Sequence, residues 1–123
     1  MVTATRIIRV QMPGGLVAVT AAPTPTPGLM INESPAFPGS WTITHLASGT
    51  AIANHFDNPE HALHLAIKFG PLCDWTLTGA ELYELLPGLE QKWLSVLEEE
   101  GALEMRPAGM RNVSLITAME PLS

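Results

Sequence analysis

The chain has 123 residues and a formal net charge of −6, and 46 % of its residues are hydrophobic against 15 % that are charged. This composition supplies core material for one domain, or for a β-rich part fused to a small helical part. The only cysteine is Cys73, which excludes an internal disulfide and favours a reducing compartment. No apolar run has the length of a signal peptide or a membrane span, so we expect a cytoplasmic protein without a membrane partner.

Residues 1–56 are expected to form the β-rich part, as two antiparallel hairpins. Pro13-Gly14-Gly15 gives the turn of the first hairpin, and Ser48-Gly49 gives the turn of the second. The proline-rich residues 23–28 cannot continue a ladder because prolines have no N–H donor, so they are predicted to form a linker on the surface. The predicted strands are residues 6–11, 16–20, 41–46 and 50–56.

The rest of the chain carries signals for three helices. A first helix is expected to start at Asn58-Pro59, with Asp57 or Asn58 as its cap, and a capping box at Thr78-x-x-Glu81 starts the second. Pro87-Gly88 is expected to stop the second helix, and Gly101 to cap the end of the third. In residues 57–123 the predicted elements are helices at 59–69, 80–86 and 89–100, and a hairpin of strands 102–106 and 112–117. Trp41, Trp75 and Trp93 are all expected in the core.

The segment from Leu77 to Gly109 resembles a winged-helix domain, and Leu94-x-x-Leu-Glu-Glu-Glu-Gly101 before a short hairpin is its most typical part. The resemblance implies an α+β protein with antiparallel β-hairpins and a three-helix, winged-helix-like C-terminal unit. In such domains the helix before that glycine enters the major groove and the wing touches the DNA backbone. The DNA contacts that it implies are Gln91, Lys92 and Ser95 on the helix, and Arg106 and Arg111 on the wing.

The charge distribution favours a protein over DNA as the partner. Residues 57–104 carry ten of the twelve carboxylates against Lys68 and Lys92, a local balance of −8 that would repel a phosphate backbone. The run Glu98, Glu99 and Glu100 is either a solvated face or a docking patch for a basic partner. We therefore predict a non-catalytic adaptor or inhibitor that binds another protein, with a winged-helix DNA-binding regulator as the alternative. Homodimerisation would also bury the apolar excess.

A second resemblance covers residues 41–76. The pattern Trp41-Thr-Ile-Thr-His-x-x-Ser-Gly-x-x-Ile-Ala53, followed by a helix and then Asp74-Trp75-Thr76, is similar to small uncharacterised proteins of actinobacteria and their phages. The resemblance implies a phage or mobile-element origin, and it implies no established chemistry.

Four histidines and Cys73 raise the alternatives of a metal site and of a catalytic pair. His61 and His64 lie one helical turn apart, and zinc favours nitrogen and sulfur ligands. Cys73 with His64 could form a nucleophile and its base. However, the spacing matches no established motif, and the sequence around Cys73 reads as a buried junction, where a thiol is inert packing. We therefore predict no metal, no cofactor and no catalytic site, and we expect ordinary roles for His45, His55, His61 and His64.

Overall fold

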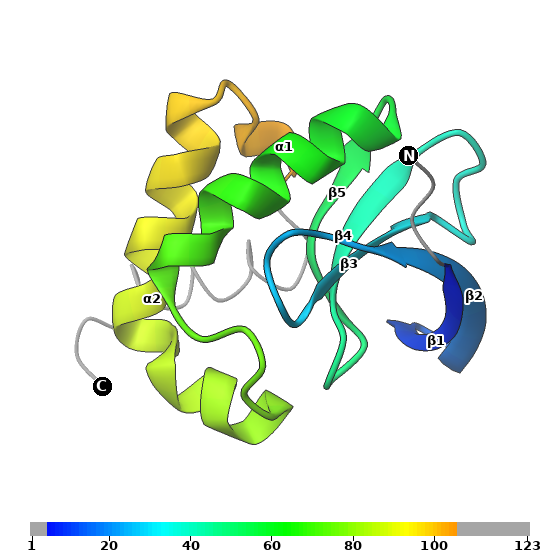
Figure 1. The fold of residues 1–123 in the computed structure, drawn as a ribbon, viewed down its shortest axis with the longest axis horizontal. Helices are drawn as coiled ribbons and strands as arrows, with labels where there is room; N and C mark the ends of the chain where they lie inside the picture. The colour runs from blue at the N-terminus through cyan, green and yellow to red at the C-terminus, as the bar shows by residue number, and fades with distance from the viewer. Residues whose placement is uncertain (1–4, 106–123) are drawn as a thin grey trace.

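The computed structural model describes residues 5–105, which form one antiparallel sheet and two α-helices (Figure 1). The five strands lie in the sheet in chain order, so each strand pairs with the next one along the sequence. A short 3-10 turn follows each helix. The elements are β1 (Arg6–Met12), β2 (Gly15–Pro23), β3 (Leu29–Glu33), β4 (Trp41–His45), β5 (Thr50–Phe56), α1 (Pro59–Phe69), η1 (Gly70–Leu72), α2 (Gly79–Glu99) and η2 (Leu103–Met105).

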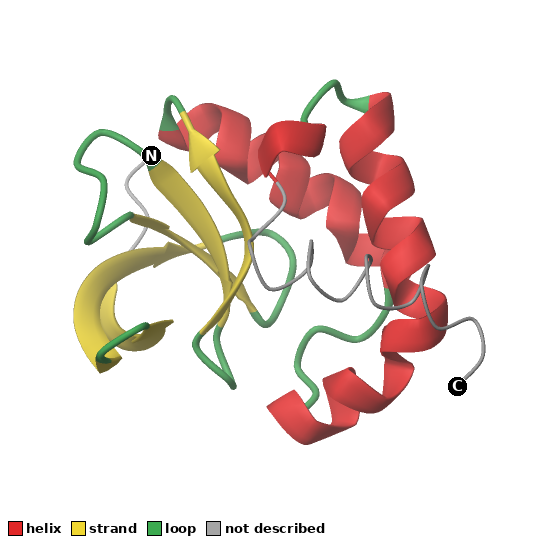
Figure 2. Ribbon diagram, turned by 180° about the vertical axis from the view of Figure 1, so that it is seen from behind, coloured by secondary structure: helices red, strands yellow, loops and turns green. Residues whose placement is uncertain are grey.

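The sheet is strongly curled, so that its first strand returns towards its last two. Figures 1 and 2 show β1 and β2 bending away from the plane of the other strands. The backbone N–H of Gln11 donates to the carbonyl oxygen of Gly49, in the turn between β4 and β5, at 2.8 Å. The side-chain amide of Gln11 donates to the carbonyl oxygen of Ser48 at 3.3 Å. These contacts join β1 to the turn that leads into the start of β5. No described strand pairs with the outer edge of β5.

Strand β5 is irregular at two positions. Its pairing with β4 shifts between Trp41 and Ile43, and again between Ile43 and Thr44, and each shift leaves one extra residue on β5. Such β-bulges bend a strand and redirect its side chains. His55 lies in β5 with a φ of 69°, a left-handed conformation that is uncommon for a residue other than glycine.

Helix α1 covers the face of the sheet formed by β3, β4 and β5. Asn58 caps the helix, because its side-chain oxygen accepts a hydrogen bond from the N–H of His61 at 2.8 Å. The predicted start of this helix at Asn58-Pro59 is confirmed. The helix packs Ala62, Leu65, Ala66 and Phe69 against the sheet.

Trp75 lies at the centre of the main core, between the sheet and both helices. Its side chain is 1 % exposed, and its indole N–H donates to the carbonyl oxygen of Phe69 at 2.8 Å. Its ring meets the ring of Trp93 edge-on, with centroids 6.1 Å apart. Because Trp93 belongs to α2 and Phe69 to α1, this one side chain connects the two helices.

The prediction of a three-helix, winged-helix-like unit is wrong, since the described residues contain two α-helices. Helix α2 runs from Gly79 to Glu99 without a break and passes through Pro87-Gly88, where the sequence indicated a stop. A proline removes one helical hydrogen bond and can bend a helix that tertiary packing holds together. Figure 1 shows α2 changing direction along its length. Buried side chains before and after the proline keep one face of α2 on the core: Leu82, Leu89, Trp93 and Leu97.

Strand β3 was not predicted from the sequence, and the segment before it is not a surface linker throughout. Thr26 is buried, at 7 % exposed, and its hydroxyl donates to the carbonyl oxygen of Ala66 in α1 at 2.8 Å. The three prolines around it are exposed, as expected for a surface segment, but Thr26 fixes the turn to α1 and returns the chain into the sheet. The residues that follow, Leu29-Met30-Ile31, are buried as the centre of the sheet.

The predicted C-terminal hairpin lies mostly outside the described residues. Residues 103–105 form the 3-10 turn η2, where the sequence indicated a strand. The second predicted strand, residues 112–117, lies outside the described residues. Within residues 5–105, neither helix combines the length and the apolar character needed to cross a membrane.

Candidate functional site

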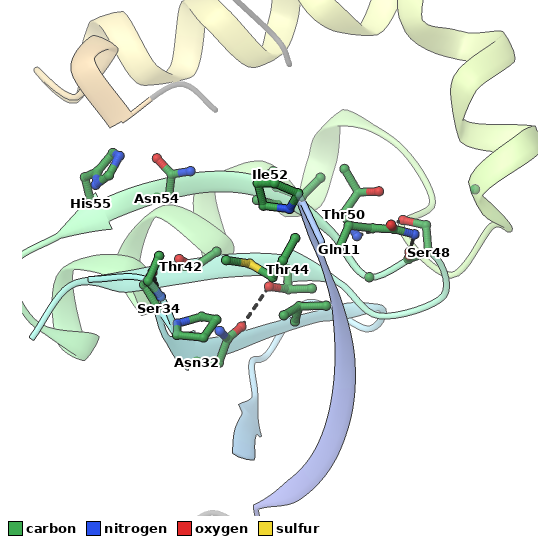
Figure 3. A pocket seen from close by; sticks show the side chains of 18 of the residues that line it. Gln11, Asn32, Ser34, Thr42, Thr44, Ser48, Thr50, Ile52, Asn54 and His55 are labelled. Atoms are coloured by element: carbon green, nitrogen blue, oxygen red, sulfur yellow. Dashed lines mark hydrogen bonds between the residues drawn. The ribbon is translucent and has the colours of Figure 1, made fainter. Parts of the chain in front are cut away.

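A cavity of about 780 Å³ lies between the curled sheet and α2. Strands β1, β3, β4 and β5 supply its sheet side, and Figure 3 shows their side chains around it. The loop at residues 34–37 and one face of α2 supply the other walls. The lining is mainly apolar, and the cavity is partly open to solvent. Its volume lies within the range of ligand sites in proteins.

The floor of the cavity is the sheet face opposite α1. Alternation along β3 and β4 directs the isoleucines to α1 and directs three polar side chains to the cavity: Asn32, Thr42 and Thr44. The hydroxyl of Thr44 donates to Oδ1 of Asn32 at 2.7 Å (Figure 3), and the amide of Asn32 donates to the carbonyl oxygen of Glu33 at 3.0 Å. The chain itself thus satisfies this buried polar pair, so these two side chains do not need a ligand as a hydrogen-bond partner.

Asn54 and His55 both line the cavity although they are consecutive residues of β5. In a regular strand their side chains would point to opposite faces. The β-bulge and the φ of 69° at His55 bring both to the same side, as Figure 3 shows. The Oδ1 atom of Asn54 is buried and accepts no hydrogen bond from the described residues. A buried acceptor without a donor costs about 1–3 kcal/mol, so a ligand with an N–H or O–H group would be stabilised at this point.

Helix α2 supplies the wall that faces the edge of β5. The indole N–H of Trp93 donates to the carbonyl oxygen of Ile52 at 3.1 Å, which fixes the helix to the strand. Two aromatic side chains of the lining remain exposed, Tyr83 at 70 % and Phe37 at 57 %. Exposed aromatic rings beside an apolar cavity are typical of binding sites, because they anchor an incoming molecule. The cavity residues of α2 are Gly79, Leu82, Tyr83, Leu86, Glu90 and Trp93.

His45 holds the loop before α2 against the sheet. Its side chain is fully buried, and Nε2 donates to the carbonyl oxygen of Leu77 at 2.9 Å. Nδ1 therefore accepts, from the hydroxyl of Ser48 at 2.7 Å, and the oxygen of Ser48 accepts the N–H of Thr50 at 3.2 Å. Burial lowers the pKa of His45 from its ordinary value of 6.5, so the folded protein keeps this imidazole neutral.

We expect the free energy of unfolding to fall as the pH drops below 6.5. The unfolded chain takes up a proton on His45 in that range, whereas burial opposes protonation in the folded state, so acid favours unfolding. The stabilisation is complete above this pH and is lost as the pH falls towards the lowered pKa. Urea unfolding between about pH 5 and pH 8 measures it. The variant His45→Gln should lose less stability over the same range, and an equal loss would assign the effect to other groups.

The hydrogen bond between Ser48 and His45 is best interpreted as part of a turn. Both residues belong to the connection between β4 and β5, and the N–H of Gly49 donates to the carbonyl oxygen of His45 at 2.8 Å. The carbonyl oxygen of Leu77 orients the ring of His45. In a catalytic pair of nucleophile and base, a carboxylate or amide side chain takes this position instead. We therefore interpret the pair as a structural contact beside the cavity.

The predicted acidic patch lies at the end of α2, outside the lining of the cavity. Glu98 and Glu99 are exposed there, whereas Glu100 is half-buried. An oxygen of Glu100 lies 2.9 Å from Nε2 of His64, and the other lies 4.0 Å from Nζ of Lys68. Side chains of α1 thus engage one of the three carboxylates, and Glu98 and Glu99 remain the exposed part of the patch.

The residues that the winged-helix resemblance implied for DNA do not form such a unit in the described part of the chain. Gln91, Lys92 and Ser95 are exposed on α2. Arg106 and Arg111 lie outside the described residues. The helix that would enter the major groove is the second half of α2, and it is continuous with the first half, where a helix–turn–helix has a turn.

The histidines and Cys73 are dispersed over the fold. The ring of His61 packs edge-on against Phe56, with centroids 5.1 Å apart, while His64 contacts Glu100. In the described part of the chain no three His, Cys, Asp or Glu side chains lie close enough together to hold a metal ion. Burial raises the pKa of the Cys73 thiol, and the neighbouring Asp74 adds to the shift, so little reactive thiolate forms near neutral pH.

Sequence reasoning missed the cavity and most of its residues. The alternation of Thr42 and Thr44 with Ile43 was visible in the sequence, and it placed the two threonines on one face. No local pattern indicated that Asn54 and His55 would share a side, because a bulge has no strong sequence signature. No protein-family model, curated protein or solved structure matches the chain.

Proposed function

We propose that this protein is a non-catalytic binding module that captures an extended, mainly apolar segment of another protein in the cavity between the sheet and α2. The observation that carries the proposal is the cavity itself, with its apolar lining and its volume of about 780 Å³. The exposed rings of Tyr83 and Phe37 provide anchors for such a segment. A module of this kind acts as an adaptor or an inhibitor, depending on what the captured segment does in its own protein.

An extended peptide fits the site because the cavity borders a sheet edge. No described strand pairs with the outer edge of β5, and a peptide can add to such an edge through backbone hydrogen bonds. The carbonyl oxygen of Ile52 already accepts the indole N–H of Trp93, so the peptide would use other backbone groups of β5. The unpartnered Oδ1 of Asn54 matches a peptide N–H donor, which a hydrocarbon chain does not have. Alternate side chains of the peptide would then point into the apolar cavity.

Charge favours a basic partner. The whole chain carries a net charge of −6, which steers a segment with lysine or arginine towards the site. The acidic residues Glu98 and Glu99 add to this field from the end of α2. Binding of DNA through a winged helix has no comparable support, since the described residues contain no winged helix that could enter a DNA groove.

The proposal predicts that exposed residues of the cavity control peptide binding. Peptides are first selected on the wild-type protein from a random phage-displayed library. The variants Tyr83→Asp and Phe37→Asp should each bind these peptides at least about tenfold more weakly than the wild type does, because each change removes an aromatic anchor. Leu85→Asp and Leu16→Asp are matched controls, since both leucines are exposed, at 42 % and 54 %, and neither lines the cavity.

Fluorescence anisotropy with the selected peptides gives the affinities, and a thermal melt of each variant checks the fold. The controls should bind as the wild type does. Equal losses in the cavity variants and the controls, or no loss in either, would contradict the proposal.

A further inference from the structure

Asn54 differs from the other polar side chains of the cavity lining in having an unpaired buried atom. The hydroxyl of Thr44 donates to Asn32, and the hydroxyl of Ser48 donates to His45. The Oδ1 atom of Asn54 accepts no hydrogen bond, and within residues 5–105 it is the only buried side-chain nitrogen or oxygen without a partner. A buried acceptor without a donor destabilises the folded chain, so it points to a molecule that supplies the donor when it binds.

The backbone of β5 is irregular at the place where Asn54 faces the cavity. The register with β4 shifts on both sides of Ile43, and neither Asn54 nor His55 is paired in register with a residue of β4. His55 also has a φ of 69°, which is unfavourable for a residue with a Cβ. Strained backbone persists only where the surrounding fold enforces it, and it clusters at binding sites. Two unfavourable features, the strained φ and the unpaired acceptor, thus meet at consecutive residues of the lining.

A primary amide is the ligand group that best complements Asn54. The carboxamide of Asn54 carries an acceptor oxygen and an NH₂ donor, and a second carboxamide can pair with both at once through two N–H···O bonds. A hydroxyl has a single oxygen for both roles, and an ester or a hydrocarbon has no donor. The side chain of Asn54 lines the cavity (Figure 3), whereas a peptide added to β5 directs its backbone groups along the sheet. The group that reaches Asn54 therefore belongs to a side chain of the captured segment.

We propose that Asn54 selects a captured segment that carries an asparagine or a glutamine among its apolar residues. The primary amide of that side chain pairs with the carboxamide of Asn54, and the apolar neighbours fill the rest of the cavity. A wholly apolar segment would leave the Oδ1 atom of Asn54 without a donor and would bind more weakly. The selection of a peptide rests on the proposed function, whereas the amide-binding position in the cavity is tested without a peptide.

Two small probes measure the pairing with Asn54. Hexanamide carries a primary amide on an apolar tail, and methyl hexanoate has the same tail and a carbonyl group but no N–H. NMR titration of the isotopically labelled protein gives the affinity of each probe for the wild type and for Asn54→Leu. Because the two probes differ in their own hydration, the ratio of their affinities is compared between the two proteins. We expect Asn54→Leu to lower the affinity for hexanamide relative to the ester at least about fivefold.

A surface carboxamide provides the matched control. Gln91→Leu removes a side-chain amide that is exposed on α2 and does not line the cavity, so the ratio should stay as in the wild type. In the wild type, the side-chain NH₂ signal of Asn54 should also shift when hexanamide is added. An unchanged ratio in Asn54→Leu, an equal change in Gln91→Leu, or no binding of hexanamide to the wild type would overturn the proposal.

The stability of Asn54→Leu separates a binding role from a structural role. The replacement removes an unpaired buried acceptor, so the urea concentration at the midpoint of unfolding should rise although the selectivity for the amide is lost. A clear fall of the midpoint would assign Asn54 to the maintenance of the fold and would overturn the proposal.

Failure of this selection and failure of the proposed function give different results. Library peptides that bind Tyr83→Asp weakly, but have no asparagine or glutamine at a fixed position, would overturn the selection and leave the proposed function intact. If hexanamide binding depends on Asn54 while no library peptide depends on the cavity, the proposed function fails and the amide-binding position holds.

Discussion

Replacing Trp75 with alanine is expected to cost about 3–5 kcal/mol of the free energy of unfolding. The side chain is 1 % exposed and contacts His45, Phe69 and Trp93 through its ring, so its removal leaves a void between the sheet and both helices. It also deprives the carbonyl oxygen of Phe69 of its donor. Because small domains are stable by only about 5–15 kcal/mol, this loss removes a large fraction of the stability of the fold.

Chemical denaturation followed by circular dichroism measures this loss. Tyr83→Ala is the control, since it removes an aromatic ring that is 70 % exposed and should change stability by less than about 0.5 kcal/mol. A loss at Trp75 no larger than at Tyr83 would mean that Trp75 does not hold the sheet and the helices together.

Gly28→Ala is expected to be the most damaging of the small substitutions. Gly28 has a φ of 95°, and a Cβ atom there would lie 2.2 Å from the backbone oxygen of Trp75. The left-handed conformation alone costs about 1–2 kcal/mol for a residue with a Cβ. The collision adds to that cost, because a backbone oxygen cannot rotate away as the end of a side chain can, so the turn between β2 and β3 must separate from the loop before α2.

Gly39→Ala separates the two contributions. Gly39 has a similar φ of 88°, but nothing lies within 4 Å of the position that its Cβ would take. We expect Gly39→Ala to lose about 1–2 kcal/mol and Gly28→Ala clearly more, both measured by urea unfolding. Equal losses at the two glycines would contradict the close packing of Gly28 on Trp75.

Elements with strong local signals were predicted well from the sequence. The hairpin of β4 and β5 was expected at 41–46 and 50–56 and lies at Trp41–His45 and Thr50–Phe56. The capping box of Thr78 and Glu81 starts α2 as expected. In these places a turn or a cap needs only neighbouring residues, so the sequence contains the necessary information.

Elements that depend on distant contacts were predicted poorly. Pro87-Gly88 is a normal helix stop, but the core contacts of Leu89 and Trp93 keep the chain helical beyond it. Strand β3 follows a proline-rich turn and is short, and it is recognisable only when β2 and β4 pair with it from both sides. Tertiary packing decided both cases.

The candidate site depends on distant contacts even more than the fold does. The cavity exists because the sheet curls until Gln11 meets Gly49, and because bulges in β5 turn Asn54 and His55 to one side. Neither feature has a pattern that a single sequence reveals. The sequence instead drew attention to Glu98, Glu99 and Glu100, which are conspicuous in composition and lie away from the cavity.

NMR titration of the isotopically labelled protein with a selected peptide shows where a partner binds. If partners bind in the cavity as proposed, the amide signals that shift should gather on β4, β5 and the first half of α2, around Thr42, Asn54 and Tyr83. A set of shifts confined to the end of α2, around Glu98 and Glu99, would contradict this proposal and would place the binding site on the acidic patch.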